Sequence, residues 1–317
     1  MSQKVSVIIT TYKRTDFLIR AINSVLDSDY NNFEVIVVDD NGLNSEYQQI
    51  NVKNLELFTA LANFKYFSMP ENSGACDARN QGAKLATGEI LMFLDDDDYY
   101  FKNKISRQVE VFKNNEIDAC LCAMRRIDDN NVEIHSRQNF PRAENLKDFM
   151  RDGNCFTTMI AIKKDSFQKI NGFSRIGRFQ DKFFMLKFFE NNLKVYLLQD
   201  QLFALTDHNQ ERISSSNIEV ISSAYEQIFD FKKKHIYLFD ARQKANLKNE
   251  YNINQANIRS AGTIFQRFEG MKFLIKSNLI FKNRNIFIKL FFSDGIVYYV
   301  KRKIGIKQHL NNSKTIT

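Results

Sequence analysis

The chain has 317 residues, of which 44% are hydrophobic and 26% charged, and only two are proline. This is the composition of an ordinary globular protein and excludes a disordered or proline-rich chain. The net charge is +8, and the stretch 271–310 carries nine Lys or Arg against the single acid Asp294, so it holds the whole excess. A nucleic-acid-binding protein usually spreads basic charge over its folded domain. The neutral body of this chain therefore argues against a nucleic-acid partner.

The cysteines and the N-terminus favour a reducing compartment. No two of the four cysteines form a C-x-x-C pair, and no histidine lies at zinc-ligand spacing from them, so we expect buried free thiols. Met1 leads directly into an apolar run, which predicts a cytosolic protein with no secretory signal. The four are Cys76, Cys120, Cys122 and Cys155.

The first hundred residues alternate apolar runs with amphipathic segments. The run 5–10 is rich in β-branched residues, as a buried parallel strand would be. The segment 15–27 has apolar residues at helical spacing, with Thr15 or Asp16 placed to cap it, and Gly88 is placed to end a later helix. In chain order we expect a strand at 5–10, a helix at 15–27, a strand at 33–38, a helix at 45–61, a strand at 64–68, a helix at 74–86 and a strand at 89–94.

The β-α-β-α order predicts an α/β fold with a mostly parallel central sheet and helices on both faces. We assign this fold to a domain at 1–215 and a helical, basic C-terminal region to 216–317. The part from 154 to 207 is mixed. There we expect a strand at 156–162, a helix at 163–170, a helix at 181–191 and a strand at 195–198.

Two acidic clusters follow predicted strands, Asp39-Asp40 and Asp95–Asp98. Ligands of open α/β sheets bind at the carboxyl ends of the strands. Alternate side chains of an extended segment point the same way, so Asp95 and Asp97 can converge. Hard cations such as Mg²⁺ or Mn²⁺ prefer carboxylate oxygens and keep positions open for phosphate. The clusters therefore indicate a metal site, and a solvated acidic loop is the alternative.

Two common nucleotide-binding folds lack their motifs in this sequence. A dinucleotide site needs G-x-G-x-x-G after the first strand, where this chain has Thr10-Thr-Tyr-Lys-Arg14. A P-loop of the form G-x-x-x-x-G-K-[ST] does not occur. Both NAD binding and P-loop phosphate binding are therefore disfavoured.

Four motifs together resemble the family 2 glycosyltransferases, which are inverting enzymes with the GT-A (Rossmann-like) fold. The resemblance is strong over about the first hundred residues and weaker to about 215. The motifs occur in the order and spacing of that family: Val5-Ser-Val-Ile-Ile-Thr-Thr-Tyr-Lys-Arg14, Val37-Val-Asp-Asp40, Glu71-Asn-Ser-Gly74 with Ala78-Arg-Asn80, and Gly88-Glu-Ile-Leu-Met-Phe-Leu-Asp-Asp-Asp-Asp98.

The resemblance implies a donor site for a UDP-sugar. Thr10 and Tyr12 would line the nucleoside pocket, and Asp40 would accept a hydrogen bond from the uracil ring. Arg79 would face the diphosphate or the acidic cluster. The alternatives are a core aromatic for Tyr12 and a surface salt bridge for Arg79.

The resemblance also places the metal and the base. Asp97 of the D-x-D signature would bind Mn²⁺ or Mg²⁺, and Asp95 or Asp96 would hold the ribose or a metal-bound water. Asp181 matches the general base, although Gln180 stands where the family has Glu, and a helix cap is the alternative for Asp181. His208 resembles a histidine near the donor phosphates, with an ordinary surface histidine as the alternative.

The segment from about 265 onward interleaves aromatic and aliphatic residues with Lys and Arg, without an uncharged run long enough to span a bilayer. Such a pattern suits the surface of an anionic membrane, and a solvated helical cap is the alternative. We therefore expect a peripheral protein on the inner face of the cytoplasmic membrane, acting on a lipid-linked saccharide in surface polysaccharide synthesis. The rivals are a nucleotidyltransferase and a non-catalytic membrane- or nucleic-acid-binding protein.

Overall fold

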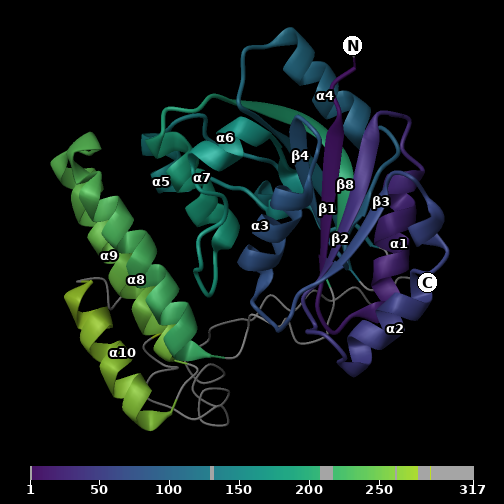
Figure 1. Ribbon diagram of the computed structural model, residues 1–317. Helices are drawn as coiled ribbons and strands as arrows, with labels where there is room; N and C mark the ends of the chain where they lie inside the picture. The colour runs from purple at the N-terminus through teal and green to yellow at the C-terminus, as the bar shows by residue number, and fades with distance from the viewer. Residues whose placement is uncertain (1, 129–131, 208–216, 261–262, 278–285, 287–317) are drawn as a thin grey trace, which may run out of the picture. The chain divides into compact units, whose positions relative to one another are not determined.

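The computed structural model of the protein describes residues 2–128, 132–207, 217–260, 263–277 and 286 (Figure 1). The chain divides into two compact units, Met1–Ser215 and Ser216–Thr317. The basic and aromatic stretch beyond 277 lies, except for Ile286, outside the described residues, as does His208.

The first unit is built on an eight-stranded sheet in the order β3-β2-β1-β4-β7-β6-β8-β5. The first four strands of this order are mutually parallel, and β6 pairs in parallel with β8. Strand β7 is antiparallel to both neighbours, and β5 is antiparallel to β8. The mostly parallel sheet is thus confirmed. The strands are β1 Val5–Thr11, β2 Phe33–Asp39, β3 Phe64–Ser68, β4 Ile90–Asp95, β5 Tyr99–Tyr100, β6 Ala119–Asp128, β7 Ile160–Lys163 and β8 Val195–Asp207.

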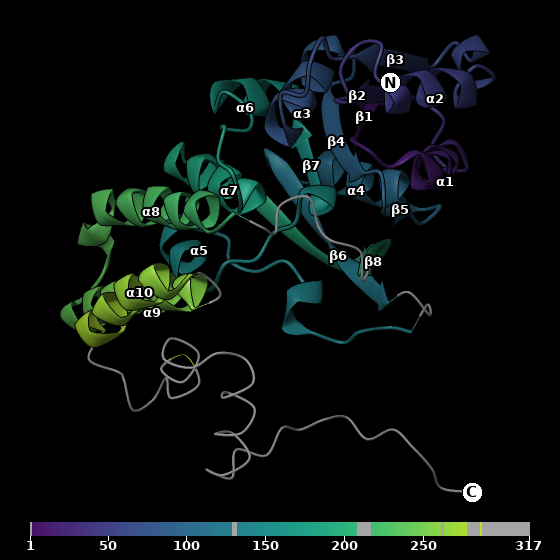
Figure 2. The same cartoon turned by 90° about the horizontal axis from the view of Figure 1, so that it is seen from below.

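Helices cover both faces of this sheet. Helix α3 packs on β1 and β2 on one face, with α6 and α7 on the same side, and α1 and α4 cover the other face (Figure 2). The strands between them are fully buried because they face helices on both sides, which explains their continuous apolar runs. The helices of this unit are α1 Thr15–Leu26, α2 Glu46–Asn54, α3 Ala75–Leu85, α4 Lys104–Asn114, α5 Leu146–Asp152, α6 Lys164–Lys169 and α7 Gln180–Glu190.

Two local predictions were wrong. Helix α1 begins at Thr15 and its cap position is Arg14, with no side-chain cap, so neither Thr15 nor Asp16 caps it. Helix α3 ends at Leu85 and its cap position is Ala86. Gly88 instead allows a close approach of two strands, because a Cβ there would lie 2.7 Å from the backbone nitrogen of Ser6.

The mixed part differs most from its predicted elements. The strand expected at 156–162 is a 3₁₀ turn, Thr157–Met159, followed by the short strand β7. The strand expected at 195–198 continues to Asp207, because β8 pairs with β6 through an irregular register. The four cysteines are buried and free, as expected.

An aromatic cluster fixes the start of α7 against the sheet. Phe93 of β4, fully buried, packs edge-on against Phe173 with ring centroids 5.2 Å apart. Phe173 stacks on Phe184 of α7 at 4.5 Å, and Phe167 of α6 contacts all three rings. The loop before α7 is therefore anchored two residues from the end of the strand that leads to the acidic residues.

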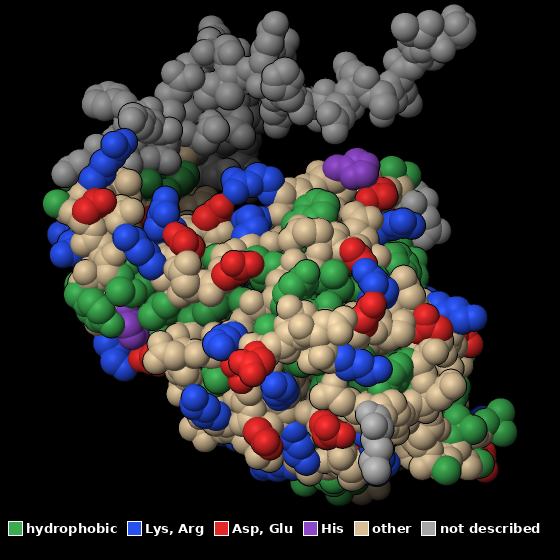
Figure 3. All heavy atoms as spheres, turned by 90° about the horizontal axis from the view of Figure 1, so that it is seen from above, with side chains coloured by type: hydrophobic (Ala, Val, Ile, Leu, Met, Phe, Trp, Pro, Cys, Tyr) green, Lys and Arg blue, Asp and Glu red, His purple; other side chains and the backbone are tan. Residues whose placement is uncertain are grey.

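The part of the second unit that the structure describes is helical, as predicted. It contains α8 Ile218–Lys234, α9 Ala241–Arg259 and α10 Ile264–Lys276. Asp240 and Thr263 begin α9 and α10 with capping boxes, and Ala256 and Leu274 form a small buried core. Among the described residues, no helix is long and apolar enough to cross a membrane. Figure 3 shows one face of the molecule, on which basic and acidic side chains are interspersed.

Candidate active site

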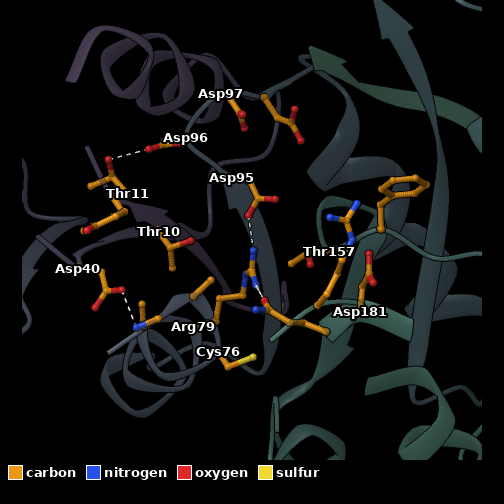
Figure 4. A pocket seen from close by; sticks show the side chains of 18 of the residues that line it. Thr10, Thr11, Asp40, Cys76, Arg79, Asp95, Asp96, Asp97, Thr157 and Asp181 are labelled. Atoms are coloured by element: carbon orange, nitrogen blue, oxygen red, sulfur yellow. Dashed lines mark hydrogen bonds and ion pairs between the residues drawn. The ribbon is translucent and has the colours of Figure 1, made fainter. Parts of the chain in front are cut away.

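A pocket of about 850 Å³ opens at the carboxyl ends of β1, β2 and β4. The first turn of α3 and the start of α7 complete its wall (Figure 4). The topology explains the location, since parallel strands end at the same edge of a sheet and ligands of such folds bind there. The pocket brings together all the described residues predicted for the site: Thr10, Tyr12, Asp40, Arg79, Asp95, Asp96, Asp97 and Asp181.

The two aspartates that end β2 have different surroundings. Asp40 lines the pocket, and its two carboxylate oxygens accept the backbone N–H groups of Ser73 and Gly74, each at 2.8 Å. Burial raises the pKa of Asp40. Asp39 is fully buried and accepts hydrogen bonds from Asn51 and Tyr66, both at 2.8 Å. Asp39 is therefore a structural residue, whereas Asp40 faces the pocket.

The acidic cluster after β4 also divides by role. Asp98 is buried and holds neighbouring segments, since it accepts the Thr158 hydroxyl at 3.0 Å and the Thr206 N–H at 3.2 Å. Asp96 is buried too, and accepts the Thr11 hydroxyl at 2.7 Å. Burial, together with the charge of Asp97, raises the pKa of Asp96 to about 7.

Asp95 and Asp97 are half-buried and remain open to the pocket. Asp95 forms an ion pair with Arg79, and Asp97 with Arg14. Oxygen ligands of this kind suit a hard cation. Among the described residues, however, no three His, Cys, Asp or Glu side chains converge as a closed metal site. A cation held by Asp95 and Asp97 would therefore take its other ligands from phosphate and water.

Arg79 connects the two sides of the pocket. It is buried, so the surface salt bridge considered as an alternative does not apply. One guanidinium nitrogen donates to Asp95 at 2.6 Å and the other to the Gln180 side-chain oxygen at 2.8 Å. Arg79 thus fixes the end of β4 relative to the first residue of α7.

Asp181 is the second residue of α7 and does not cap it, because the cap position is Phe179. Its carboxylate accepts the Lys182 N–H at 2.7 Å and lines the pocket. Burial raises the pKa of Asp181 to about 6, with a smaller contribution in the same direction from Asp95. Figure 4 shows Asp181 across the pocket from Asp40, with Arg79 and Asp95 between them. A carboxylate in this position can accept a proton near neutral pH.

Sequence reasoning missed Arg14 and Thr11, which both contact Asp96. A usable signal existed. The parallel pairing of β1 with β4 places Thr10 beside Asp95, so the residues after each strand must also lie close together. The contacts of Arg14 depend on a loop in which Lys13 has a φ of 55°, which no spacing rule predicts.

Comparisons with known proteins agree with this geometry. The sequence model of the protein family described as "Glycosyl transferase family 2" matches residues 6–171, about half of the chain. WfaP of Escherichia coli, described as a UDP-Glc:alpha-D-GlcNAc-diphosphoundecaprenol beta-1,3-glucosyltransferase, is 32% identical over 114 residues, which are 36% of this chain and 43% of WfaP. The matches to two other curated relatives span 18% and 53% of those relatives' own length, so the chain matches only parts of these proteins.

Two solved structures share the fold. Residues 1–349 of Staphylococcus aureus TarS, in complex with UDP-GlcNAc, superpose with a TM-score of 0.64 at 20% identity, over 90% of this chain and 81% of that one. The mannosyltransferase PcManGT of Pyrobaculum calidifontis, in complex with GDP-Man and Mn²⁺, superposes with a TM-score of 0.56 at 15% identity, over 96% and 81%. The chain belongs to glycosyl transferase family 2 and has a GT-A-like fold.

Proposed function

We propose that the chain is a metal-dependent, inverting transferase that moves a hexose from a UDP-sugar to a lipid-linked saccharide in surface polysaccharide synthesis. The proposal rests on two kinds of group that face each other across one pocket. Asp95 and Asp97 lie at the end of β4, and the raised-pKa carboxylate of Asp181 lies across from them. A diphosphate leaving group and an attacking hydroxyl need such separate sites.

The donor side would hold the nucleotide through residues at the strand ends. Thr10 and Tyr12 would line the nucleoside pocket, and Asp40 would accept the uracil N–H with a lone pair left free by its two backbone donors. Asp97 would bind Mn²⁺ or Mg²⁺, with Asp95 or Asp96 holding the ribose or a metal-bound water. The bound cation would stabilise negative charge on the leaving diphosphate.

The acceptor side would use Asp181 as general base. As the acceptor hydroxyl oxygen forms its bond to the anomeric carbon, the bond from that carbon to the diphosphate oxygen breaks. The hydroxyl proton passes to Asp181, and UDP leaves with the bonding electron pair. Attack opposite the leaving group inverts the anomeric centre. A carboxylate with a pKa of about 6 is mostly ionised at pH 7 and basic enough for this transfer.

The two units would have separate roles, with transfer in 1–215 and attachment to the inner face of the membrane through 216–317. The support comes from α10, where Phe265, Phe268 and Ile275 are 72%, 61% and 54% exposed at spacings of one helix face. Lys272 and Lys276 lie on the same helix. The lipid-linked acceptor named for WfaP is consistent with such attachment. Phe265→Glu with Phe268→Glu should reduce sedimentation with anionic vesicles, and unchanged sedimentation would contradict this role.

The transfer proposal is tested by UDP or GDP release from a panel of sugar nucleotides, with Mn²⁺, Mg²⁺ or EDTA. Wild type should release UDP only with metal, and Asp97→Ala and Asp181→Ala should each lose at least about a hundredfold. Asp165→Ala, at an exposed position in the first turn of α6, is the matched control. Metal-independent release, or full activity in Asp97→Ala, would refute the metal role. Donor binding without turnover would indicate that the lipid acceptor must be supplied.

A further inference from the structure

Arg14 carries the positive charge closest to the carboxylate that we assign to the metal. Its side chain is 21% exposed, and the residue lies three positions after the end of β1. One guanidinium nitrogen contacts the Asp97 carboxylate and lies 3.4 Å from the Asp96 carboxylate. Both aspartates are at least as enclosed, with side-chain exposures of 7% and 19%. The contact is therefore an enclosed ion pair and not an exposed surface pair.

Each carboxylate of the cluster has a partner in the protein without donor. Asp95 pairs with Arg79, and Asp98 accepts hydrogen bonds from Thr158 and Thr206. Asp96 and Asp97 share Arg14. Four consecutive carboxylates repel one another strongly where water is partly excluded, so these partners are needed to keep the loop in place.

Arg14 therefore occupies one oxygen of the carboxylate to which a divalent cation on Asp97 would bind. Two positive groups on one carboxylate repel, so the cation must move the guanidinium away. Removing Arg14 from Asp96 and Asp97 also breaks its ion pairs, which opposes binding of the cation alone. A diphosphate changes this balance, because it supplies further ligands to the cation and a new partner for a displaced guanidinium, which binds phosphate through paired N–H groups.

We propose that Arg14 is an internal counter-ion that occupies the metal position in the donor-free protein and yields it when cation and diphosphate bind together. Arg14 is a positioning residue in this proposal, which rests on the proposed metal-dependent transfer. The consequence is thermodynamic coupling: the protein without nucleotide binds the cation weakly, and UDP strengthens cation binding because the diphosphate accepts the guanidinium.

The test measures Mn²⁺ binding to the full chain by the loss of the electron paramagnetic resonance signal of free Mn²⁺, with and without UDP. Arg14→Gln, which keeps a polar side chain without charge, should bind Mn²⁺ at least about tenfold more tightly than wild type when UDP is absent. The strengthening of Mn²⁺ binding by UDP should be at least about tenfold smaller in the variant than in wild type. Arg107→Ala removes an Arg–Asp pair outside the pocket and should match wild type in both measurements.

Unchanged or weaker Mn²⁺ binding by Arg14→Gln without UDP would overturn the counter-ion role. If Arg14→Gln does not fold, Arg14→Lys gives a second reading: its single ammonium cannot bridge both carboxylates as the guanidinium does, so the gain in Mn²⁺ affinity should be smaller but of the same sign. Failure of wild type to bind Mn²⁺ even with UDP would count against the proposed metal-dependent function itself. Normal coupling in wild type together with no change in either variant would refute only the role of Arg14.

Discussion

The two halves of the sheet build the same pocket by different means. In the parallel half, β3-β2-β1-β4, the polar residues simply follow buried strands, and the common direction of the strands brings Thr10, Asp40 and Asp95 to one edge. In the mixed half, β7-β6-β8-β5, the proposed base does not follow the end of a strand. Asp181 is placed by a loop with left-handed residues at Asn171 and Phe179 and by the aromatic cluster beneath it.

The comparison separates the proposed donor side, which is fixed by topology, from the proposed acceptor side, which is fixed by side-chain packing. Arg79 joins them, since it contacts Asp95 on one side and Gln180 on the other. Substitutions in the parallel half should therefore change donor binding. Substitutions around α7 should change proton transfer instead.

The largest effect is expected at Asp181. Because its pKa is about 6 and the ionised form is the base, kcat/KM for transfer should fall about tenfold per pH unit below pH 6 and level off above it. Asp181→Asn should lower transfer about 10²- to 10⁴-fold and remove this limb of the profile. Asp165→Asn serves as the control. A wild-type profile that is flat from pH 5 to 7 would contradict the assignment of Asp181 as the base.

The same pKa shift makes a prediction for stability. A folded pKa of about 6 lies above that of an Asp in an unfolded chain, about 3.9, so the unfolded state releases this proton first. The contribution of Asp181 to the free energy of unfolding therefore decreases as pH rises from about 4 to 6. At pH 7.5, Asp181→Asn should unfold at a temperature about 2–4 °C higher than wild type, which corresponds to a gain of about 1 kcal/mol in the free energy of unfolding. Near pH 4, the two proteins should unfold at the same temperature. Calorimetry at the two pH values checks this sign.

The donor side is tested by the neighbouring pair Asp39 and Asp40. Asp40→Asn places an amide N–H₂ group opposite the N–H of Ser73 or Gly74, so one of the two hydrogen bonds is lost. This loss should raise the donor KM about tenfold and change kcat less. Asp39→Asn disturbs the buried bonds to Asn51 and Tyr66, so it should lower the free energy of unfolding by about 1–3 kcal/mol. Its donor KM should stay within about twofold of wild type. Equal rises in KM for both variants would contradict the separate roles assigned to the two aspartates.

The same difference between the two halves of the sheet determined how much could be predicted from the sequence. Period and composition were sufficient for the parallel half, because a strand buried on both faces must be an apolar run and its carboxyl end must lie at the ligand edge. The predicted positions of Asp40, Asp95 and Asp97 in one pocket followed from this rule and from the family motifs. Neither Asp39 nor Asp98 could be separated from its neighbours, since only tertiary contacts show which carboxylate is satisfied internally.

The mixed half was harder for a physical reason. Strand β7 has only four residues and starts from a 3₁₀ turn, so its apolar period is too short to define its ends. Strand β8 continues to Asp207 because it pairs with β6, a non-local contact that spacing along the chain does not encode. Phe179 occupies a left-handed conformation that a local rule would give to Gly or Asn. Asp181 was predicted as the base through family resemblance alone, and its surroundings needed the structure.

The smallest expected effect is the most direct test of the link between the halves. Gln180→Glu places a carboxylate next to Asp181 and within reach of Arg79. The added negative charge should raise the pKa of Asp181, and Arg79 should offset part of this, so the acidic limb of the pH profile should move up by about half a unit. Gln180→Ala is the matched control, because it removes the Arg79 contact without adding charge. A shift of the same size in both variants would mean that the position of Arg79 sets the pKa of Asp181. A shift in Gln180→Glu only would show that the pKa of Asp181 responds to the charge at position 180 while Arg79 stays paired with Asp95. The charge around the base could then be changed without disturbing the donor side.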